Sequence, residues 1–280
     1  MLTRSSLQLG MRSVPMVAIA GVLWLSPPTA AQSAGPIMSD QTSQCTPGVR
    51  GYVGYSVITL PGLPYTATLK VTFERKEADG TTIRSVSRTV NARDSNGKAR
   101  IANSLGCGRD QNGQSYDQVY VRIADRAAGT FLDWSPGPYA PKVAKLYNQP
   151  EAFRDPQLSL QWYDYERVQK ITGQPTKTIR GESIGKKVID GIEVQGRRIT
   201  VTTPVGEDGN TEPIVVVHEW WISTELGVVM ADMSDDPKRG HTEMELENFT
   251  RGEPDYSLFV PPDGYTVVQT YPKEAKSAQR

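Results

Sequence analysis

Apolar and polar side chains alternate strictly from Tyr65 to Lys76, and this period of two limits the fold more than any other feature of the chain. The apolar positions, which would share one face of a strand, are Ala67, Leu69, Val71 and Phe73. Asp79-Gly80 then supplies a turn, and residues 82–91 return as a second segment rich in Thr, Val and Ser. The pattern predicts an antiparallel hairpin with one solvated face.

The same spacing of strand and turn recurs along most of the sequence. Residues 98–103, 118–124 and 130–134 are further predicted strands, with loops at 106–108 and 110–113. Residues 192–250 form a predicted meander of four strands, at 192–203, 214–223, 227–232 and 242–250. We therefore predict a mainly β protein, with α+β as the alternative: a curved antiparallel sheet or unclosed half-barrel with one or two short helices.

The remaining segments are less regular. Residues 142–148 and 158–171 fit a short helix or a strand equally well, and 177–184 and 188–189 are short extended pieces. Asp255 is the natural N-cap of a single turn over Tyr256–Phe259, which Pro261-Pro262 ends. Residues 265–268 are the last predicted strand.

The first 31 residues have the pattern of a secretory signal peptide. Arg4 and Arg12 precede the apolar run 14–25, and the small residues Thr29-Ala-Ala31 follow. Cleavage is expected after Ala31, which leaves no stable membrane span. The expected organisation is a signal peptide at 1–31, a flexible lead-in at 32–48, one β-rich domain at 49–271 with a possible sub-boundary near 139–176, and a disordered tail at 272–280.

Charge and cysteine content limit the partners and the compartment. The chain has 31 basic and 31 acidic residues and no long Lys/Arg run, so nucleic acid is not an expected partner. Its two cysteines, Cys45 and Cys107, lack metal-ligand spacing, and in an oxidising compartment they predict a disulfide. We expect a periplasmic or secreted location.

His218-Glu219 and His241-x-Glu243 are the candidate metal ligands, because two histidines and a carboxylate can form an open metal site. Strand parity opposes this interpretation. His218 shares its side of the strand with Val216 and Trp220, whereas His241 alternates with Met244 and points to the other side. Only a β-bulge would bring the two histidines together, so no metal and no other cofactor is predicted.

Gly181-Glu-Ser183-Ile-Gly185 matches the string of a serine-hydrolase nucleophile elbow. An elbow needs a strand before the serine and a helix after it, whereas Gly185 leads into a hairpin. A hydrolase using Ser183 and a metal-dependent enzyme using His218 are therefore the alternative functions, and no catalytic residue is assigned.

Two faces of the predicted meander are candidate binding surfaces. The apolar side is the candidate ligand-binding surface and carries Val216, His218, Trp220, Met244 and Leu246. The opposite side is the candidate partner-facing surface and carries His241, Glu243, Glu245 and Glu247. The alternatives are a plain packed core for the first and a solvated face for the second.

Several blocks resemble a family of uncharacterised exported bacterial proteins. They are residues 93–100, 184–196, 213–223, 234–240 and 251–261, of which the last is the most specific. The general layout is similar to the unclosed β-barrels of periplasmic lipoprotein carriers of the LolA type, which hold acyl chains on a curved sheet. The similarity concerns the architecture and assigns no site residues. We predict an exported, non-enzymatic protein that binds a lipid, another apolar molecule or a cell-envelope protein.

Overall fold

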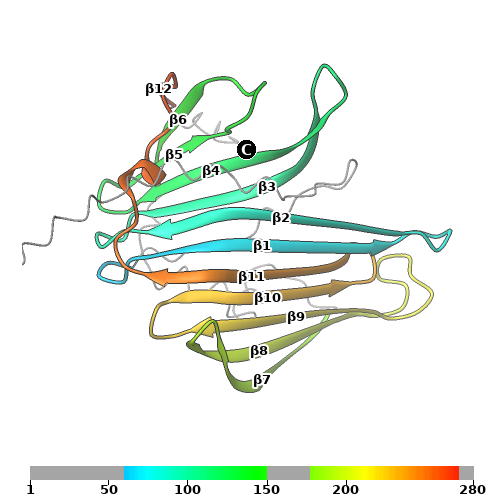
Figure 1. Cartoon of the computed structure of the whole chain (residues 1–280). Coiled ribbons are helices and arrows are strands. Elements are labelled where there is room, and N and C mark those ends of the chain that lie inside the picture. Colours follow the sequence, from blue (N-terminus) through cyan, green and yellow to red (C-terminus); the bar gives the residue numbers. More distant parts are fainter. Residues whose placement is uncertain (1–59, 150–176, 271–280) are drawn as a thin grey trace, which may run out of the picture. The chain divides into compact units, whose positions relative to one another are not determined.

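The computed structural model describes residues 60–149 and 177–270, and these residues form one β-sheet. Its strands are β1 (Tyr65–Lys76), β2 (Thr82–Arg93), β3 (Ala99–Arg109), β4 (Ser115–Asp125), β5 (Thr130–Trp134), β6 (Val143–Asn148), β7 (Thr178–Ile189), β8 (Ile192–Thr203), β9 (Ile214–Ser223), β10 (Val228–Asp236), β11 (Gly240–Arg251) and β12 (Thr266–Gln269). Their order in the sheet is β12-β6-β5-β4-β3-β2-β1-β11-β10-β9-β8-β7 (Figure 1).

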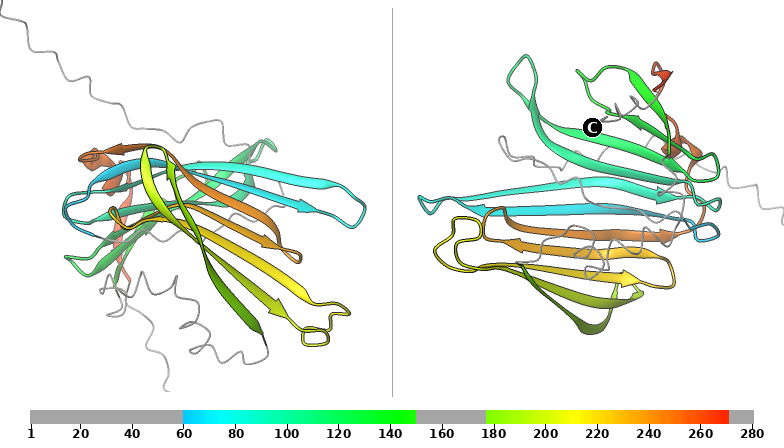
Figure 2. Two further views of the ribbon diagram at one scale, coloured as in Figure 1. Left: turned by 90° about the horizontal axis from the view of Figure 1, so that it is seen from below. Right: turned by 180° about the vertical axis from the view of Figure 1, so that it is seen from behind.

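The sheet is open, with β12 and β7 as its edges. Figure 2 shows that the strands twist and curve across the sheet. Neighbouring strands are antiparallel except β12, which runs parallel to β6. The predicted mainly β fold with a curved, unclosed sheet is confirmed, and the only helical turn in the described residues is η2 (Tyr256–Phe259).

Strand β1 lies in the middle of the sheet because it pairs with β2 on one side and with β11 on the other. The hairpin predicted from alternation is therefore joined to the last strand of the predicted meander. An apolar cluster lies mainly on β1 and β8–β11 and includes Leu69, Ile199, Trp220, Met244 and Leu246. A second cluster lies mainly on β3–β6 and includes Val121, Ile123, Trp134 and Phe259.

Two predicted breaks in the strands are wrong. Residues 106–108 were expected in a loop but belong to β3, and 177–184 with 188–189 form the single strand β7. In both places the pairing register shifts, between Ser104 and Cys107 and between Ser183 and Gly185. A bulge absorbs the extra residue, so glycines that resemble loop residues continue a strand.

The less regular segments predicted from the sequence can be compared with the structure where it is described. Residues 142–148, left open between helix and strand, form β6, and 265–268 correspond to β12. Asp255 is the N-cap of η2 and accepts a 2.8 Å hydrogen bond from the backbone N–H of Ser257. Phe259 of this turn is buried in the second apolar cluster.

Several predictions concern residues outside the described ranges. They are the signal peptide at 1–31, the lead-in at 32–48, the helix or strand at 158–171 and the tail at 272–280. All described elements lie in one unit, Pro36–Arg280. No helix in residues 60–149 or 177–270 has the length and apolar character needed to cross a membrane.

Strands β2 and β3 are joined by few backbone bonds. Their register contains only the pairs Ala92–Arg100 and Arg93–Ala99. Beyond these pairs, side chains bridge the two strands: the Thr89 hydroxyl donates to the Ala102 carbonyl at 2.7 Å, and the Ala102 N–H donates to Asn91 Oδ1 at 2.8 Å. Side chains thus replace part of the backbone ladder.

Arg93 is a buried residue that donates hydrogen bonds to backbone carbonyls beside the first apolar cluster. Its side chain is fully buried, with an exposed fraction of 0%. Nε donates to the Leu63 carbonyl at 2.9 Å, and Nη2 donates to the Leu226 carbonyl at 2.8 Å. The guanidinium also lies 5.1 Å from the centroid of the Tyr65 ring. Arg93 therefore connects the segment before β1 with the turn between β9 and β10.

Cys107 lies in β3 opposite Asp117 of β4. Cys45 lies outside the described residues, so its disulfide with Cys107 stays a prediction. We expect Cys107→Ser to lower the free energy of unfolding by about 3 kcal/mol, because a disulfide restricts the unfolded chain. Urea denaturation with and without reductant measures this. Two titratable thiols in the native protein would exclude the pairing.

Candidate functional site

One face of the central strands carries a continuous row of side chains that we call the apolar face. Trp220 of β9 lies opposite Asp232 of β10, which lies opposite Met244 of β11, which lies opposite Val71 of β1. Directly opposed residues share a face of a sheet, so these four side chains form one row across four strands. Other members of the apolar face are Leu69, Ile199, Val201, Val216, His218 and Leu246.

The side chains at the centre of the apolar face are buried. Trp220 is 6% exposed, Met244 is 4% exposed and Leu246 is 1% exposed. Val216 and His218, closer to the end of β9, are half-buried. All five residues proposed from the sequence to bind a ligand therefore lie on one face of the sheet. In each strand they are an even number of residues apart, and the pairing between strands aligns them.

His218 is a neutral part of this face. Its ring stacks on Trp220, with centroids 5.8 Å apart and an angle of 9° between the planes. Burial lowers the pKa of His218, and Asp236 opposes this shift while Arg239 adds to it. The imidazole therefore contributes an aromatic surface rather than a charge at neutral pH.

Asp232 is the one carboxyl group in the central row, and sequence reasoning missed it. A hydrogen bond from the Trp220 side chain favours its ionised form, but burial dominates and raises the pKa of Asp232 to about 7. Its pairing with Met244 follows from the β10–β11 hairpin, whereas its pairing with Trp220 also depends on the register shift between Val229 and Ala231. No sequence pattern marks this bulge, so the sequence alone could not place Asp232 beside Trp220.

The two histidines lie on opposite faces, as strand parity predicted. Ser234 of β10 is opposite His218, whereas the next residue, Asp235, is opposite His241. Neighbouring residues of a strand point to opposite sides, so the histidines cannot share a metal ion. In the two described ranges, no group of three or more His, Cys, Asp or Glu side chains is arranged to hold a metal.

The face that carries His241 is called the acidic face. The three glutamates predicted to lie on this face are paired directly with residues of β1. Glu243 lies opposite Thr72, Glu245 opposite Lys70 and Glu247 opposite Thr68. Lys70 Nζ lies 2.8 Å from Glu247 Oε1, and Arg88 Nε lies 3.7 Å from Glu247 Oε2. His241 Nε2 lies 3.1 Å from Glu243 Oε1. Basic side chains of the same sheet thus supply counter-charges for part of the acidic face.

Ser183 lies in the interior of strand β7, opposite Arg197 of β8. Its side chain is exposed, and β7 continues to Ile189 before a turn leads into β8. A nucleophile elbow places the serine on a sharp turn between a strand and a helix, and this context is absent at Ser183. The string Gly181 to Gly185 is therefore a bulged strand.

Trp221 lies on the acidic face, so the two adjacent tryptophans point to opposite sides. It faces Gly196 of β8 across the strand pair. A Cβ at Gly196 would lie 2.5 Å from the Trp221 ring, so only glycine leaves room for the indole. Lys187 Nζ lies 3.9 Å from the ring centroid and covers the indole with a cation–π contact.

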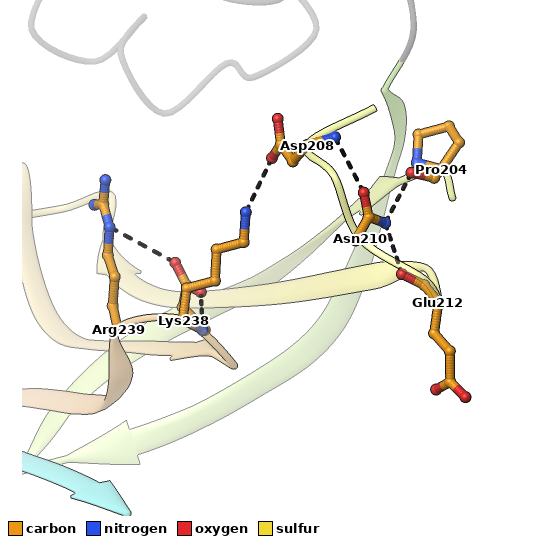
Figure 3. Close-up of polar contacts among 7 residues, drawn as sticks. Pro204, Asp208, Asn210, Glu212, Lys238 and Arg239 are labelled. Atoms are coloured by element: carbon orange, nitrogen blue, oxygen red, sulfur yellow. Dashed lines mark hydrogen bonds and ion pairs between the residues drawn. The ribbon is translucent and has the colours of Figure 1, made fainter. Parts of the chain in front are cut away.

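The loop between β8 and β9 and the turn between β10 and β11 contact each other at the end of the sheet near His218. Figure 3 shows Lys238, in the turn between β10 and β11, pointing toward Asp208 in the loop between β8 and β9; Nζ lies 3.2 Å from Oδ2. Asn210 holds that loop by donating to the carbonyls of Pro204 and Glu212. The loop and the turn therefore form an ordered, charged rim.

No family model and no curated protein sequence matches this chain. Among solved structures, it is similar to a β-barrel-like protein of the domain of unknown function DUF1849 from Brucella abortus (12% identity, 69% of this chain, 100% of that chain, TM-score 0.35). It is also similar to the Mycobacterium tuberculosis lipoprotein LppX (13% identity, 68% and 86%, TM-score 0.26).

A third similar structure is described as an outer membrane lipoprotein-sorting protein domain from Vibrio parahaemolyticus (10% identity, 70% and 88%, TM-score 0.26). With identities and TM-scores this low, no function is carried over from these structures to this chain.

Proposed function

We propose that this protein is an exported, non-enzymatic binding protein that holds an apolar ligand, such as a lipid or an acyl chain, on the apolar face. The observation that carries the proposal is the row of Trp220, Met244 and Val71 on β9, β11 and β1, in which Asp232 is the member from β10 and which Leu69 and Leu246 extend. A curved sheet lined in this way presents apolar side chains from three of these four strands, and Val216 and His218 are its half-buried members.

The energetics favour a long apolar ligand over a small polar one. Each methylene group that moves from water into an apolar environment contributes about 0.8 kcal/mol. A chain lying across these two rows would contact Trp220 and Met244 in one row and His218 in the other. Because His218 is held neutral by burial, it adds aromatic contact without an unpaired charge.

A periplasmic or secreted location is part of the proposal, and it rests on the signal-peptide pattern of residues 1–31. In that compartment the expected source of an apolar ligand is the cell envelope. The balanced charge of the chain also fits a lipid or protein partner better than a nucleic acid.

Val216 and Val215 provide a matched pair of variants for testing the proposal. Val216 lies on the apolar face opposite Val201, and Val215 lies on the acidic face opposite Thr202 with 42% of its surface exposed. Val216→Lys is expected to reduce co-purified lipid about tenfold, because it places a charge among apolar groups. Val215→Lys is expected to leave the bound lipid unchanged.

Native mass spectrometry of the protein purified from its own envelope, followed by solvent extraction, measures the bound lipid. Circular dichroism establishes that both variants are folded. Equal lipid content in the wild type and in both lysine variants would contradict ligand binding on the apolar face.

A cell-envelope protein partner is the second candidate function. The observation that favours it is the exposure of Glu243 and Glu245, whose side chains are 61% and 50% exposed on the acidic face. His241, Glu243, Glu245 and Glu247 would be the contacts to a basic partner. Lys70 and Arg88 already compensate Glu247, so the apolar ligand is the primary proposal.

A further inference from the structure

We propose that Asp232 contacts the polar head of the ligand and makes the apolar face select amphiphiles with a cationic or hydroxyl head over those with a carboxylate head. This inference rests on the proposed function, because it names the ligand class of the same face. Its basis is the position of one carboxyl group in a row of apolar side chains.

Asp232 is surrounded by apolar groups along its row. Trp220 lies directly opposite on β9, and Met244 lies directly opposite on β11. Both side chains are buried and Asp232 itself is half-buried, so the carboxyl group is partly removed from bulk water and still reachable by a ligand. A carboxylate in such surroundings needs a partner, because removing it from water is costly unless it is paired or hydrogen-bonded.

The partner that the protein provides is weak for a carboxylate. The Trp220 side chain donates one hydrogen bond to Asp232. An indole has a single N–H, so it can satisfy only one of about four acceptor positions on the carboxylate. In the described part of the chain, no Lys or Arg forms an ion pair with Asp232. A ligand donor could therefore occupy the remaining acceptor positions.

The charged and titratable groups on neighbouring strands do not replace that donor. On β9, His218 is held neutral. On β8, Arg197 lies opposite Trp220 and is exposed. On β10, Asp236 accepts from the Lys238 N–H at the rim, and on β11 the residues that share this face are Met244 and Thr242. Asp232 is thus the one carboxyl group in the central row.

The charge of the ligand head determines how it interacts with the Asp232 carboxylate. A carboxylate head placed beside Asp232 would bring two negative charges together where water screens them poorly. An ammonium head would instead form a charge-assisted hydrogen bond, and a hydroxyl head would form a neutral one. The expected affinity order is therefore amine, then alcohol, then carboxylate.

Three ligands that differ only in the head test this order: dodecylamine, dodecanol and dodecanoate. Each displaces a neutral fluorescent apolar probe from the full-length mature protein at pH 8. The wild type is expected to bind dodecylamine at least about tenfold more tightly than dodecanoate, a difference of roughly 1.4 kcal/mol. Asp232→Asn, which keeps the size of the side chain, is expected to bring the amine-to-carboxylate ratio close to one.

Glu182→Gln removes an exposed carboxylate from the acidic-face side of β7, where Glu182 lies opposite Arg198, and is the matched control, with an expected ratio equal to that of the wild type. If Asp232 serves only to orient Trp220, Asp232→Asn would weaken all three ligands alike and leave the ratio unchanged, which overturns the inference. If the neutral probe does not bind the wild type, the proposed function fails and the inference fails with it. If the probe binds but the heads are not distinguished, only the inference fails.

Discussion

Arg93→Ala is expected to lower the free energy of unfolding by about 4 kcal/mol, which is a large fraction of the stability of a typical domain. The substitution removes the donors that satisfy the carbonyls of Leu63 and Leu226. Each buried acceptor left unpaired costs about 1 to 3 kcal/mol, and the cavity beside Tyr65 adds to this cost. Urea denaturation followed by circular dichroism measures the change.

Two further variants make the Arg93 result specific. Arg84 lies on the same strand with an exposed side chain, so Arg84→Ala is expected to change stability by less than about 0.5 kcal/mol. Arg93→Lys keeps the charge but loses the planar fork, and an intermediate loss is expected. If Arg93→Ala destabilises the protein no more than Arg84→Ala, the two carbonyl contacts do not stabilise the fold.

The stability of the wild type is expected to fall as the pH rises from about 4 to 7, relative to Asp232→Asn. Burial raises the pKa of Asp232 from 3.8 to about 7 in the folded protein. The folded state therefore binds a proton that the unfolded state has released, and the stability from this proton is complete below pH 3.8. It is lost as the pH passes through 7, and the total is about 4 kcal/mol.

Urea denaturation of both proteins at several pH values between 4 and 8 measures this difference. The stability of the wild type minus that of Asp232→Asn should decrease steadily and level off above pH 7. Glu182→Gln, whose carboxyl group is exposed and faces Arg198 rather than a histidine, should run parallel to the wild type above about pH 5. Parallel curves for the wild type and Asp232→Asn would show that Asp232 is not desolvated.

Alternation was sufficient to predict the strands with one solvated face. The bounds of β1 were predicted without error because apolar side chains recur at every second residue before a clear turn, and those of β9 because its run of Val, Ile and Trp is typical of a strand. The bulged strands were not predictable in this way. Gly106, Gly108 and Gly185 resemble loop residues, and only pairing with a neighbouring strand shows that the chain stays extended there.

The candidate site was predictable to the same extent. Parity within β9 and β11 placed His218 and His241 on opposite sides, since it depends only on counting residues. Placing Asp232 required the register between strands, including a shift that no local pattern encodes. The pattern within each strand therefore predicted the apolar face but did not show that Asp232 lies on it.

The pairing of β1 with β11 determines when this sheet can be completed during synthesis. Tyr65 pairs with Arg251, so the middle of the sheet joins residues that leave the ribosome far apart in time. The β1–β2 hairpin therefore exposes a long unpaired edge until residues 240–251 are available, and such non-local pairing slows folding. A polypeptide that must cross a membrane before folding would be kept transport-competent by this late closure.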